Sequence, residues 1–271
     1  MISGVAMCDE GGTVADSPLG GRGPFRLSVR RLLAIVLTFG CVFEVVAWIW
    51  GQVWNAREAA RDSQCLNNLK MIGLALLNYH DAVGCFPPAY IADAGGKPMH
   101  SWRVLLMPYL ESSPLYNQYK FSEPWDGPSN RTLASRMFSL YACPSDPGHL
   151  EGGLTSYFVV VGQETCFPSS KSMTIVGSPA SPGSLPDMIT VVECSDVAVP
   201  WMEPRDLDLN RMSFRVNDPA RPGISSRHPG GANVVEVCGR VRKLYNATPP
   251  AEVRAALTIR GRVIDRPRGT P

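Results

Sequence analysis

The residues with the clearest potential for chemistry surround a single histidine near the C-terminus. His228 has Asp218, Ser225, Ser226 and Cys238 close to it in the sequence. A histidine base beside a serine or cysteine, oriented by a third group, is the arrangement of nucleophilic catalysis. The context of a nucleophile is missing, because no Gly-x-Ser-x-Gly elbow occurs. We therefore predict that His228 is structural and hydrogen-bonds loop backbone. Contact with a ligand or partner stays open, and no catalytic residue is predicted.

Metal binding is the second chemistry to consider. The chain has four histidines and eight cysteines, but no Cys-x-x-Cys pair or His-rich spacing typical of structural zinc sites. His80 and His100 could share a metal, and Asp187, Asp206 and Asp208 offer loop carboxylates, but regular calcium-ligand spacing is missing. The sequence predicts no metal and no cofactor, and it identifies no small-molecule substrate.

Charge and aromatic residues limit the other binding partners. A formal net charge of +2 is too small for an electrostatic nucleic-acid interface, so nucleic acid is excluded as a partner. Trp102, Trp125 and Trp201 lie in otherwise motif-like segments. Because they are large apolar groups, we expect core anchors rather than a platform for carbohydrate.

The most apolar part of the chain lies near its N-terminus. Residues 32–50 read LLAIVLTFGCVFEVVAWIW, with Glu44 as their one charged residue. A membrane-spanning helix needs about 20 such residues. The segment ends in Trp48, Ile49 and Trp50 and continues to Trp54, whereas a signal peptide ends in small residues. We predict an uncleaved transmembrane helix over residues 32–54.

Basic residues predict the orientation of this helix. Four arginines precede it and two follow closely: Arg22, Arg26, Arg30, Arg31, then Arg57 and Arg61. Because positive flanks stay in the cytoplasm, residues 1–31 are predicted to be a disordered cytoplasmic tail. Residues 85–271 then form an exported domain, and the protein is a single-pass protein of the cytoplasmic (inner) membrane.

The predicted export places most of the cysteines in a compartment where disulfides can form. An even number of cysteines follows the span, in a compartment where disulfides persist: Cys65, Cys85, Cys143, Cys166, Cys194 and Cys238. Six cysteines permit 15 pairings, and the sequence does not choose among them. For Cys238, a free thiol in a hairpin turn is an equal alternative.

The helix is predicted to continue beyond the membrane. Leu66, Leu69, Ile72, Leu76 and Tyr79 are spaced 3, 3, 4 and 3 residues apart, which places them on one helix face. One helix from about Arg31 to Ala82 follows, with residues 55–84 as its amphipathic continuation. Leu66, Leu69, Ile72 and Leu76 are predicted to pack it against the exported domain.

The rest of the chain predicts an α+β fold. Ser101 is expected to cap a short helix, and further helices are expected at about 129–140 and 250–258. Runs of β-branched and aromatic residues at 155–162, 187–194 and 233–244 predict strands, with two strands in the last run. Residues 163–186 and 195–232 are rich in Pro, Gly and Ser, so long loops are expected beside an antiparallel sheet.

Several motifs in this order resemble a known family. They are AREAARDSQCLNNLKMIGLALLNYHDAVGCFPP (56–88), SWRVLLMPYLE (101–111), LYNQYKFSEPWDGPSN (115–130), CPSDP (143–147), TSYFVVVG (155–162), VPWMEPRDL (199–207) and SRHPGGANVVEVCGRVRKL (226–244). The chain resembles the bacterial pilin-like family built on domain of unknown function 1559. The resemblance implies a pilin-like or type II secretion pseudopilin-like fold, in which a long N-terminal helix packs on an antiparallel sheet.

The family signature is a histidine, nine residues and then Asp-Gly. Here Cys-Gly stands in place of Asp-Gly, and the matching residues are His228, Pro229, Gly230, Gly231, Asn233, Cys238 and Gly239. Asp and Gly suit a tight hairpin turn because both tolerate positive φ. With cysteine at the first position, the turn is expected to use Gly239 alone in the left-handed region.

A second departure concerns the N-terminus. Family members begin with a prepilin sequence, Gly followed by Phe-Thr-Leu-Val-Glu, whereas the matching position of that Glu is Ala34 here. We therefore predict a membrane-anchored, pseudopilin-like structural or interaction protein without catalysis. Its partners would be the lipid bilayer and itself, or other pilin-like subunits, through residues 32–76. The alternative is an exported, non-polymerising module that binds or senses a ligand. An exported hydrolase using His228 is kept only as a hypothesis to test.

Overall fold

The computed structural model describes every residue except 1–27, 111–112, 137–138, 174–186 and 259–271. The predicted cytoplasmic tail therefore lies almost wholly outside the described residues. The chain divides into two compact units, Met1–Val53 and Trp54–Pro271. The candidate site described below lies within the second unit.

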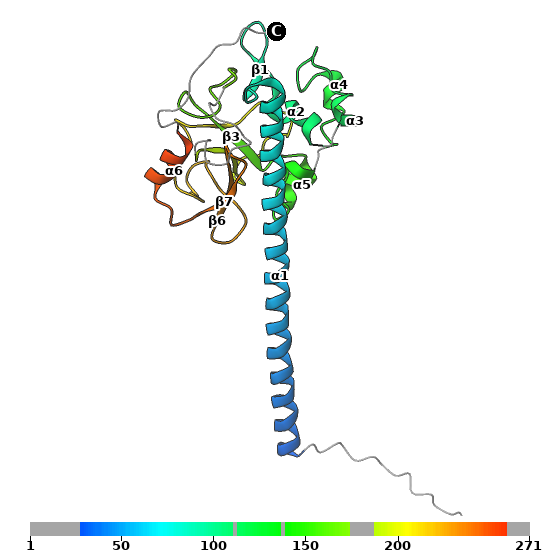
Figure 1. The fold of residues 1–271 in the computed structure, drawn as a ribbon. Coiled ribbons are helices and arrows are strands. Elements are labelled where there is room, and N and C mark those ends of the chain that lie inside the picture. The colour runs from blue at the N-terminus through cyan, green and yellow to red at the C-terminus, as the bar shows by residue number, and fades with distance from the viewer. Residues whose placement is uncertain (1–27, 111–112, 137–138, 174–186, 259–271) are drawn as a thin grey trace, which may run out of the picture. The chain divides into compact units, whose positions relative to one another are not determined.

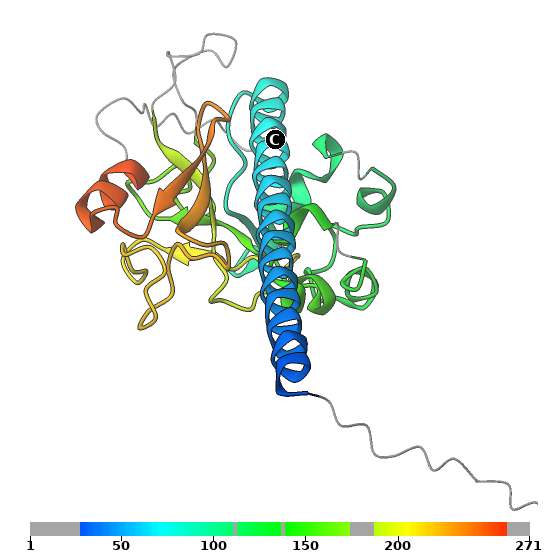
Figure 2. The same ribbon diagram turned by 90° about the horizontal axis from the view of Figure 1, so that it is seen from below.

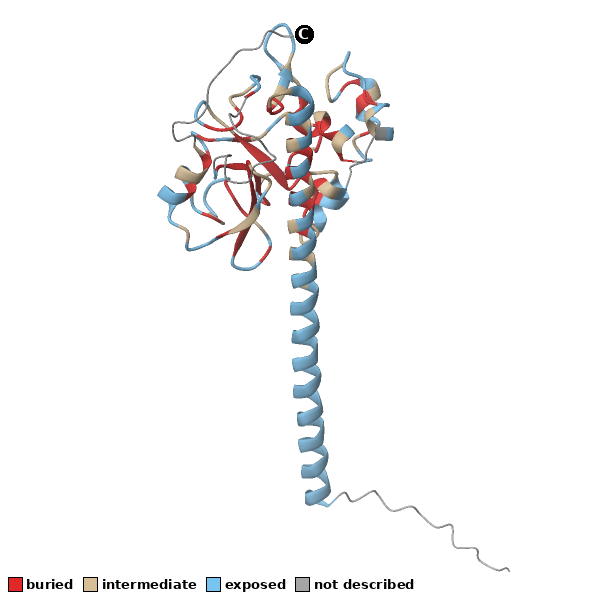
Figure 3. Ribbon diagram, viewed as in Figure 1, coloured by how far each residue is buried: buried red, intermediate tan, exposed pale blue. Residues whose placement is uncertain are grey.

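Helix α1 runs without interruption from Val29 to Val83, which confirms the predicted helix from Arg31 to Ala82. It contains an 18-residue window of mean hydropathy 2.4, none of which is buried. Every residue from Val29 to Val53 is exposed (Figure 3). Among the described residues, this is the one helix whose length and composition suit a membrane span.

The second half of α1 is the packing element of the second unit. It lies between the sheet on one side and four short helices on the other (Figures 1 and 2). These are α2 (Trp102–Leu105), α3 (Ser113–Tyr116), α4 (Pro128–Arg131) and α5 (Pro147–Gly152). Leu69, Ile72 and Leu76 are buried, whereas Leu66 is only partly buried. Burying each of the three fully stabilises the fold by about 1.5–3 kcal/mol. The amphipathic face expected from the sequence is therefore used, with Leu66 at its margin.

A five-stranded sheet forms the centre of this unit. Its strands, in spatial order, are β5 (Leu207–Asp208), β3 (Tyr157–Val161), β4 (Ile189–Glu193), β6 (Gly231–Glu236) and β7 (Val241–Tyr245). Its three long antiparallel pairings join the strands predicted from the three apolar runs. The short strand β5, which the sequence did not predict, pairs with β3 in parallel. The α+β class is confirmed, and the sheet is mixed rather than wholly antiparallel. A separate two-stranded sheet pairs β1 with β2.

In chain order the elements after α1 are β1 (Tyr90–Ala92), β2 (Pro98–Ser101), α2 (Trp102–Leu105), η1 (Met107–Tyr109), α3 (Ser113–Tyr116), α4 (Pro128–Arg131), η2 (Ser139–Tyr141), α5 (Pro147–Gly152), β3 (Tyr157–Val161), β4 (Ile189–Glu193), β5 (Leu207–Asp208), β6 (Gly231–Glu236), β7 (Val241–Tyr245) and α6 (Pro250–Leu257).

Both faces of the sheet are buried. Alternate residues of β3 point to opposite faces, as the strand period of two requires. Tyr157 and Val159 join the core cluster that contains Leu69 and Ile72 of α1. Phe158 and Val160 join a second cluster, which α6 closes with its buried Val253 and Leu257. This explains why the strands read as continuous apolar runs rather than as alternating ones.

Two local predictions have different outcomes. Ser101 caps α2 by accepting a hydrogen bond from the backbone N–H of Arg103, as predicted. The helix expected at about 129–140 is wrong, because α4 ends at Arg131. The side chain of buried Asn130 bonds the backbone of Lys120, Glu123 and Pro124 instead. An asparagine that satisfies loop backbone in this way competes with helix formation.

The β6–β7 turn follows the expectation for Cys-Gly. Gly239 has φ +78°, whereas Cys238 is not among the residues with positive φ. The N–H of Gly239 donates to the carbonyl of Glu236 at 2.8 Å. A glycine at the second turn position is thus sufficient to form the hairpin turn, and Cys238 is a free thiol.

Gly73 provides a test of the contact between helix and sheet. A Cβ at this position would lie 2.8 Å from Cγ1 of Val235 on β6, which is closer than real Cβ contacts. We expect Gly73→Ala to lower the free energy of unfolding by about 1–3 kcal/mol through overpacking. Denaturation of the full chain in detergent, followed by near-UV circular dichroism, measures this. Gly51→Ala is the matched control, since nothing lies within 4 Å of its Cβ. Equal stability of the two variants would contradict the tight contact.

Candidate functional site

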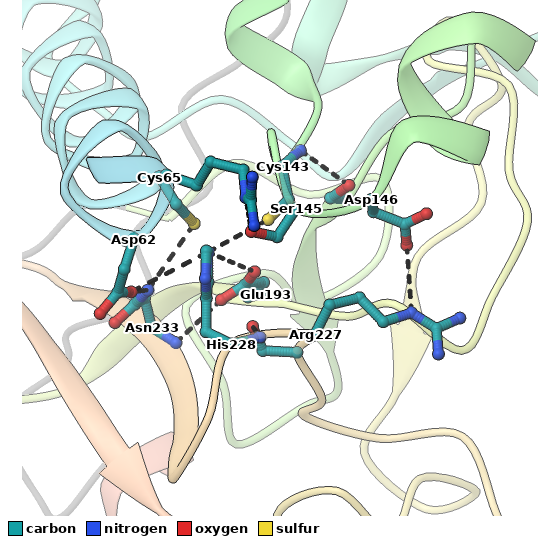
Figure 4. Close-up of polar contacts among 12 residues, drawn as sticks. Asp62, Cys65, Cys143, Ser145, Asp146, Glu193, Arg227, His228 and Asn233 are labelled. Atoms are coloured by element: carbon teal, nitrogen blue, oxygen red, sulfur yellow. Dashed lines mark hydrogen bonds and ion pairs between the residues drawn. The ribbon is translucent and has the colours of Figure 1, made fainter. Parts of the chain in front are cut away.

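Four buried side chains from distant parts of the chain meet beside α1 (Figure 4). Cys65 lies on α1, Cys143 follows η2, Glu193 ends β4, and His228 lies in the loop before β6. One ligand atom from each lies within 4.8 Å of the ligand atoms of the other three. Two thiols, an imidazole and a carboxylate are all groups that can bind a metal ion. The set lies entirely within the second unit.

His228 is the centre of the site. Its Nε2 lies 3.3 Å from Cys143 Sγ, and its Nδ1 lies 2.6 Å from Glu58 Oε1. The imidazole is completely buried. The prediction that this ring hydrogen-bonds loop backbone is therefore wrong, because its partners are side chains of α1 and of the segment after η2. The sequence offered no spacing that would pair positions 58, 143 and 228.

One face of α1 supplies three polar groups to the site. Glu58, Asp62 and Cys65 are separated by four and three residues, so they lie on the same side of the helix. Asp62 accepts a hydrogen bond from the side-chain amide of Asn233 at 2.9 Å and pairs with Lys243 at 2.7 Å. Glu58 and Asp62 were not predicted from the sequence, although their helical spacing was a signal that could have indicated them.

Glu193 is the buried carboxylate of the site and was also missed. It ends β4, a strand that is buried along its whole length, and its side chain is 1% exposed. Its Oε2 accepts a hydrogen bond from the backbone N–H of Asn233 at 3.1 Å. Its Oε1 lies 3.8 Å from His228 Nε2 and has no hydrogen-bond partner among the described residues. His228 and Asn233, both from the segment 226–244, thus lie at one site.

The four side chains that meet beside α1 change one another's affinity for protons. They are Cys65, Cys143, Glu193 and His228. Burial opposes the charged form of His228, but its hydrogen bonds with Cys65 and Glu58 and the charge of Glu193 raise its pKa to about 9. Burial and the nearby Cys65 raise the pKa of Glu193 to about 8. Hydrogen bonding from Cys143 lowers the pKa of Cys65, and the same contact raises the pKa of Cys143. The site therefore favours a negatively charged thiolate at Cys65 beside the positively charged imidazole of His228.

The row of Cys143, His228 and Glu58 has the order of a nucleophile, a base and an orienting carboxylate. Cys143 is 1% exposed, however, and a substrate carbonyl must approach its nucleophile closely. Of the residues considered for hydrolysis, Asp218 instead bonds Ser213, and Ser225 accepts from the N–H of Ser195. The arrangement thus suits a bound ion better than turnover of a substrate.

The disulfides that the sequence left open are not formed in the described part of the structure. All six cysteines are free: Cys65, Cys85, Cys143, Cys166, Cys194 and Cys238. Cys65 and Cys143 lie near each other, but both face His228. Cys194 lies next to Glu193 in sequence, yet its Sγ contacts the hydroxyl of Ser225 at 3.7 Å. Even cysteine number therefore did not indicate pairing here.

The other groups considered for metal binding have separate partners. His80 packs on Phe86, and Nδ1 of His100 lies 2.9 Å from the hydroxyl of Tyr119. The three aspartates expected on calcium-type loops are likewise apart. Asp187 pairs with Arg240, Asp206 pairs with Arg103, and Asp208 caps the backbone of Asn210. Among these groups the described residues show no shared metal site.

The second unit is an α+β domain with a buried cysteine, histidine and glutamate cluster. Residues 54–188 match the family model described as "Protein of unknown function (DUF1559)". We assign this stretch, just under half of the chain, to that family. It includes Cys65 and Cys143 and ends before Glu193 and His228. Searches of curated proteins and of solved structures found no match.

Proposed function

We propose that this protein is a membrane-anchored, pseudopilin-like structural or interaction protein that performs no catalysis. The observation that carries the proposal is the division of one helix into two kinds of surface. Residues from Val29 to Val53 are apolar and exposed, whereas residues 65–76 bury one face in the α+β domain. An exposed apolar segment of this length is suited to lipid or to the same segment of another subunit.

The same proposal includes an orientation and a location. Arg22, Arg26, Arg30 and Arg31 before the span outnumber Arg57 and Arg61 after it, which favours a cytoplasmic N-terminus in the inner membrane. The tryptophans at positions 48, 50 and 54 suit the opposite interface. The α+β domain would then lie outside the cytoplasm. The absence of catalysis is supported by the burial of both thiols beside His228.

An exported, non-polymerising binding or sensing module is the second candidate function. Ala34 occupies the position at which pilin-type subunits carry the glutamate used in docking into a filament. The two candidates differ in whether the membrane-spanning segments of separate chains associate. Cys41 is an exposed cysteine within that segment, so it reports on such contacts directly.

The test uses cells that express the full chain. We expect it to remain in the membrane pellet after alkaline washing, and external protease to digest the domain while protecting a fragment that ends near residue 54. Mild oxidation should then produce a Cys41-linked dimer, which Cys41→Ser abolishes. A soluble chain or protection of the domain would contradict the anchored, exported protein. Correct insertion of a chain that remains monomeric after oxidation, with Cys41 unlinked, would instead support the non-polymerising module.

Intact mass of the same preparation determines the N-terminal state. A chain beginning near Met1 is expected, because the prepilin sequence is missing. A methylated start at residues 24–31 would show that a divergent prepilin signal is processed. That result would make assembly into a filament or secretion complex the leading function.

A further inference from the structure

The inner cluster consists of Cys65, Cys143, Glu193 and His228. It has the dimensions of a four-coordinate metal site. Cys143 Sγ and His228 Nε2 are 3.3 Å apart, and Glu193 Oε1 and His228 Nε2 are 3.8 Å apart. Zinc bonds of about 2.0 Å to N or O and 2.3 Å to S place tetrahedral ligands about 3.3–3.8 Å from one another. The remaining pairs are within 4.8 Å, so small side-chain movements would complete the geometry.

The hydrogen bonds around the cluster orient the atoms that face inward. Glu58 holds Nδ1 of His228 and leaves Nε2 directed at the thiols, which is the carboxylate–histidine arrangement found around bound metals. The N–H of Asn233 holds the outer oxygen of Glu193. The hydroxyl of Tyr157 donates to Cys65 Sγ at 3.2 Å, as it would to a bound thiolate. Three of the four ligand side chains thus have a hydrogen-bond partner outside the cluster.

One carboxylate oxygen of Glu193 is free of hydrogen bonds in the described part of the chain and faces the cluster, as a metal ligand would. This atom is buried without a hydrogen bond among the described residues, and a buried polar atom left unsatisfied keeps the full penalty of its desolvation. The nearby basic side chains of α1 and β7 have other partners, because Arg61 pairs with Glu58 and Lys243 pairs with Asp62. The group nearest this oxygen is His228 Nε2 at 3.8 Å, itself a proposed ligand. An ion among the four inner groups would satisfy both the carboxylate and the thiols.

The ligand types determine which ion fits. Thiolate and imidazole ligands favour zinc and similar transition metals, whereas calcium and magnesium require oxygen ligands. Four protein ligands, all buried, leave no open coordination position, which is the form of a structural site. We propose that Cys65, Cys143, Glu193 and His228 bind one Zn²⁺ ion as a structural centre.

Such an ion would join four separate segments of the second unit. It would connect α1 to the segment after η2, to the end of β4 and to the loop before β6. Because these ligands come together only in the folded chain, the binding energy of the metal would contribute to folding. The membrane-connected helix would then be fixed to its domain by coordination as well as by apolar packing.

The test measures metal in the full chain, purified in detergent with reductant and without chelator. We expect about one Zn²⁺ per chain by elemental mass spectrometry. After removal of zinc, Co²⁺ should produce the absorption of thiolate-to-cobalt charge transfer. Cys65→Ser and Cys143→Ser should each lose most of that absorption. Cys166→Ser, a change at a buried cysteine outside the cluster, should retain both the metal and the spectrum.

A variant of similar shape addresses poor folding of the cysteine variants. Glu193→Gln keeps the size of the side chain and should weaken Zn²⁺ at least tenfold, while the absorption from the two thiolates remains. Glu58→Gln leaves every proposed ligand in place and should weaken Zn²⁺ by about 10–100-fold.

Three results would overturn the proposal. The first is wild-type protein without stoichiometric zinc and without cobalt charge-transfer absorption. The second is a Cys65–Cys143 disulfide in protein taken from its membrane with thiols blocked, which would make the cysteines a covalent link instead. The third is an equal loss of metal in Cys166→Ser.

Discussion

Arg103→Met lowers the free energy of unfolding by about 3–5 kcal/mol, the expected result of removing one partner from a buried ion pair. Arg103 is completely buried, and its guanidinium lies 2.7 Å from the carboxylate of Asp206, which is 2% exposed. The same guanidinium donates two hydrogen bonds to the carbonyl of Tyr157. Methionine fills much of the space but leaves both acceptors without this donor. Chemical denaturation of the full chain in detergent measures the loss.

Acidification should reduce this loss. Burial raises the pKa of Asp206 to about 6, even though the charge of Arg103 opposes that change. Without Arg103 the pKa rises further. A carboxyl whose pKa is higher in the folded state destabilises the fold progressively as pH rises through that value. The difference between wild type and Arg103→Met should therefore be larger at pH 8 than at pH 5.

Asp206→Asn is the control for charge. It keeps the shape of the side chain and resembles the protonated form that burial favours, so its loss should be smaller than that of Arg103→Met. The double variant should lose less than the sum of the two single losses, because the partners are in contact. Additive losses that do not change with pH would contradict a coupled ion pair.

Trp201→Ala should cost about 3–5 kcal/mol, the usual range for truncating a buried aromatic residue. Trp201 is 1% exposed and stacks on Tyr141, with ring centroids 6.1 Å apart. Its Nε1–H donates to the carbonyl of Ala134 at 3.1 Å. The substitution removes the ring and the hydrogen bond together. Denaturation midpoints of the full chain in detergent, with an unchanged slope, check the value.

Trp201→Phe separates these two contributions. It keeps an aromatic ring and loses the N–H donor, so we expect a loss about half that of Trp201→Ala or less. A stable Trp201→Ala protein would instead mean that this side chain does not anchor the core. Trp102 is also buried, so both rings form core contacts and neither provides a surface platform for carbohydrate.

Part of the fold could be predicted because its signals are local. The long helix, the strands β3, β4, β6 and β7, and α6 are each indicated by periodicity, β-branched runs or flanking Pro and Gly. Strands β1, β2 and β5 were not predicted. Strand β5 has two residues and forms only by pairing with β3. The 129–140 helix was predicted wrongly, since the buried contacts of Asn130 cannot be seen in a helical pattern.

By itself the sequence determined the apolar segment, the amphipathic face beyond it and the α+β class, because these depend on residue type at regular spacing. Only the tertiary structure decided the chemistry. Cys65, Cys143, Glu193 and His228 come from segments far apart in the chain, and no pattern of residue types fixes which distant segments meet. They lie together because α1 packs across β3, β4 and β6, bringing its Glu58, Asp62 and Cys65 against the strand end at Glu193 and the loop of His228. The sequence therefore indicated His228 and the cysteines as residues with chemical potential, but not that they meet each other and Glu193.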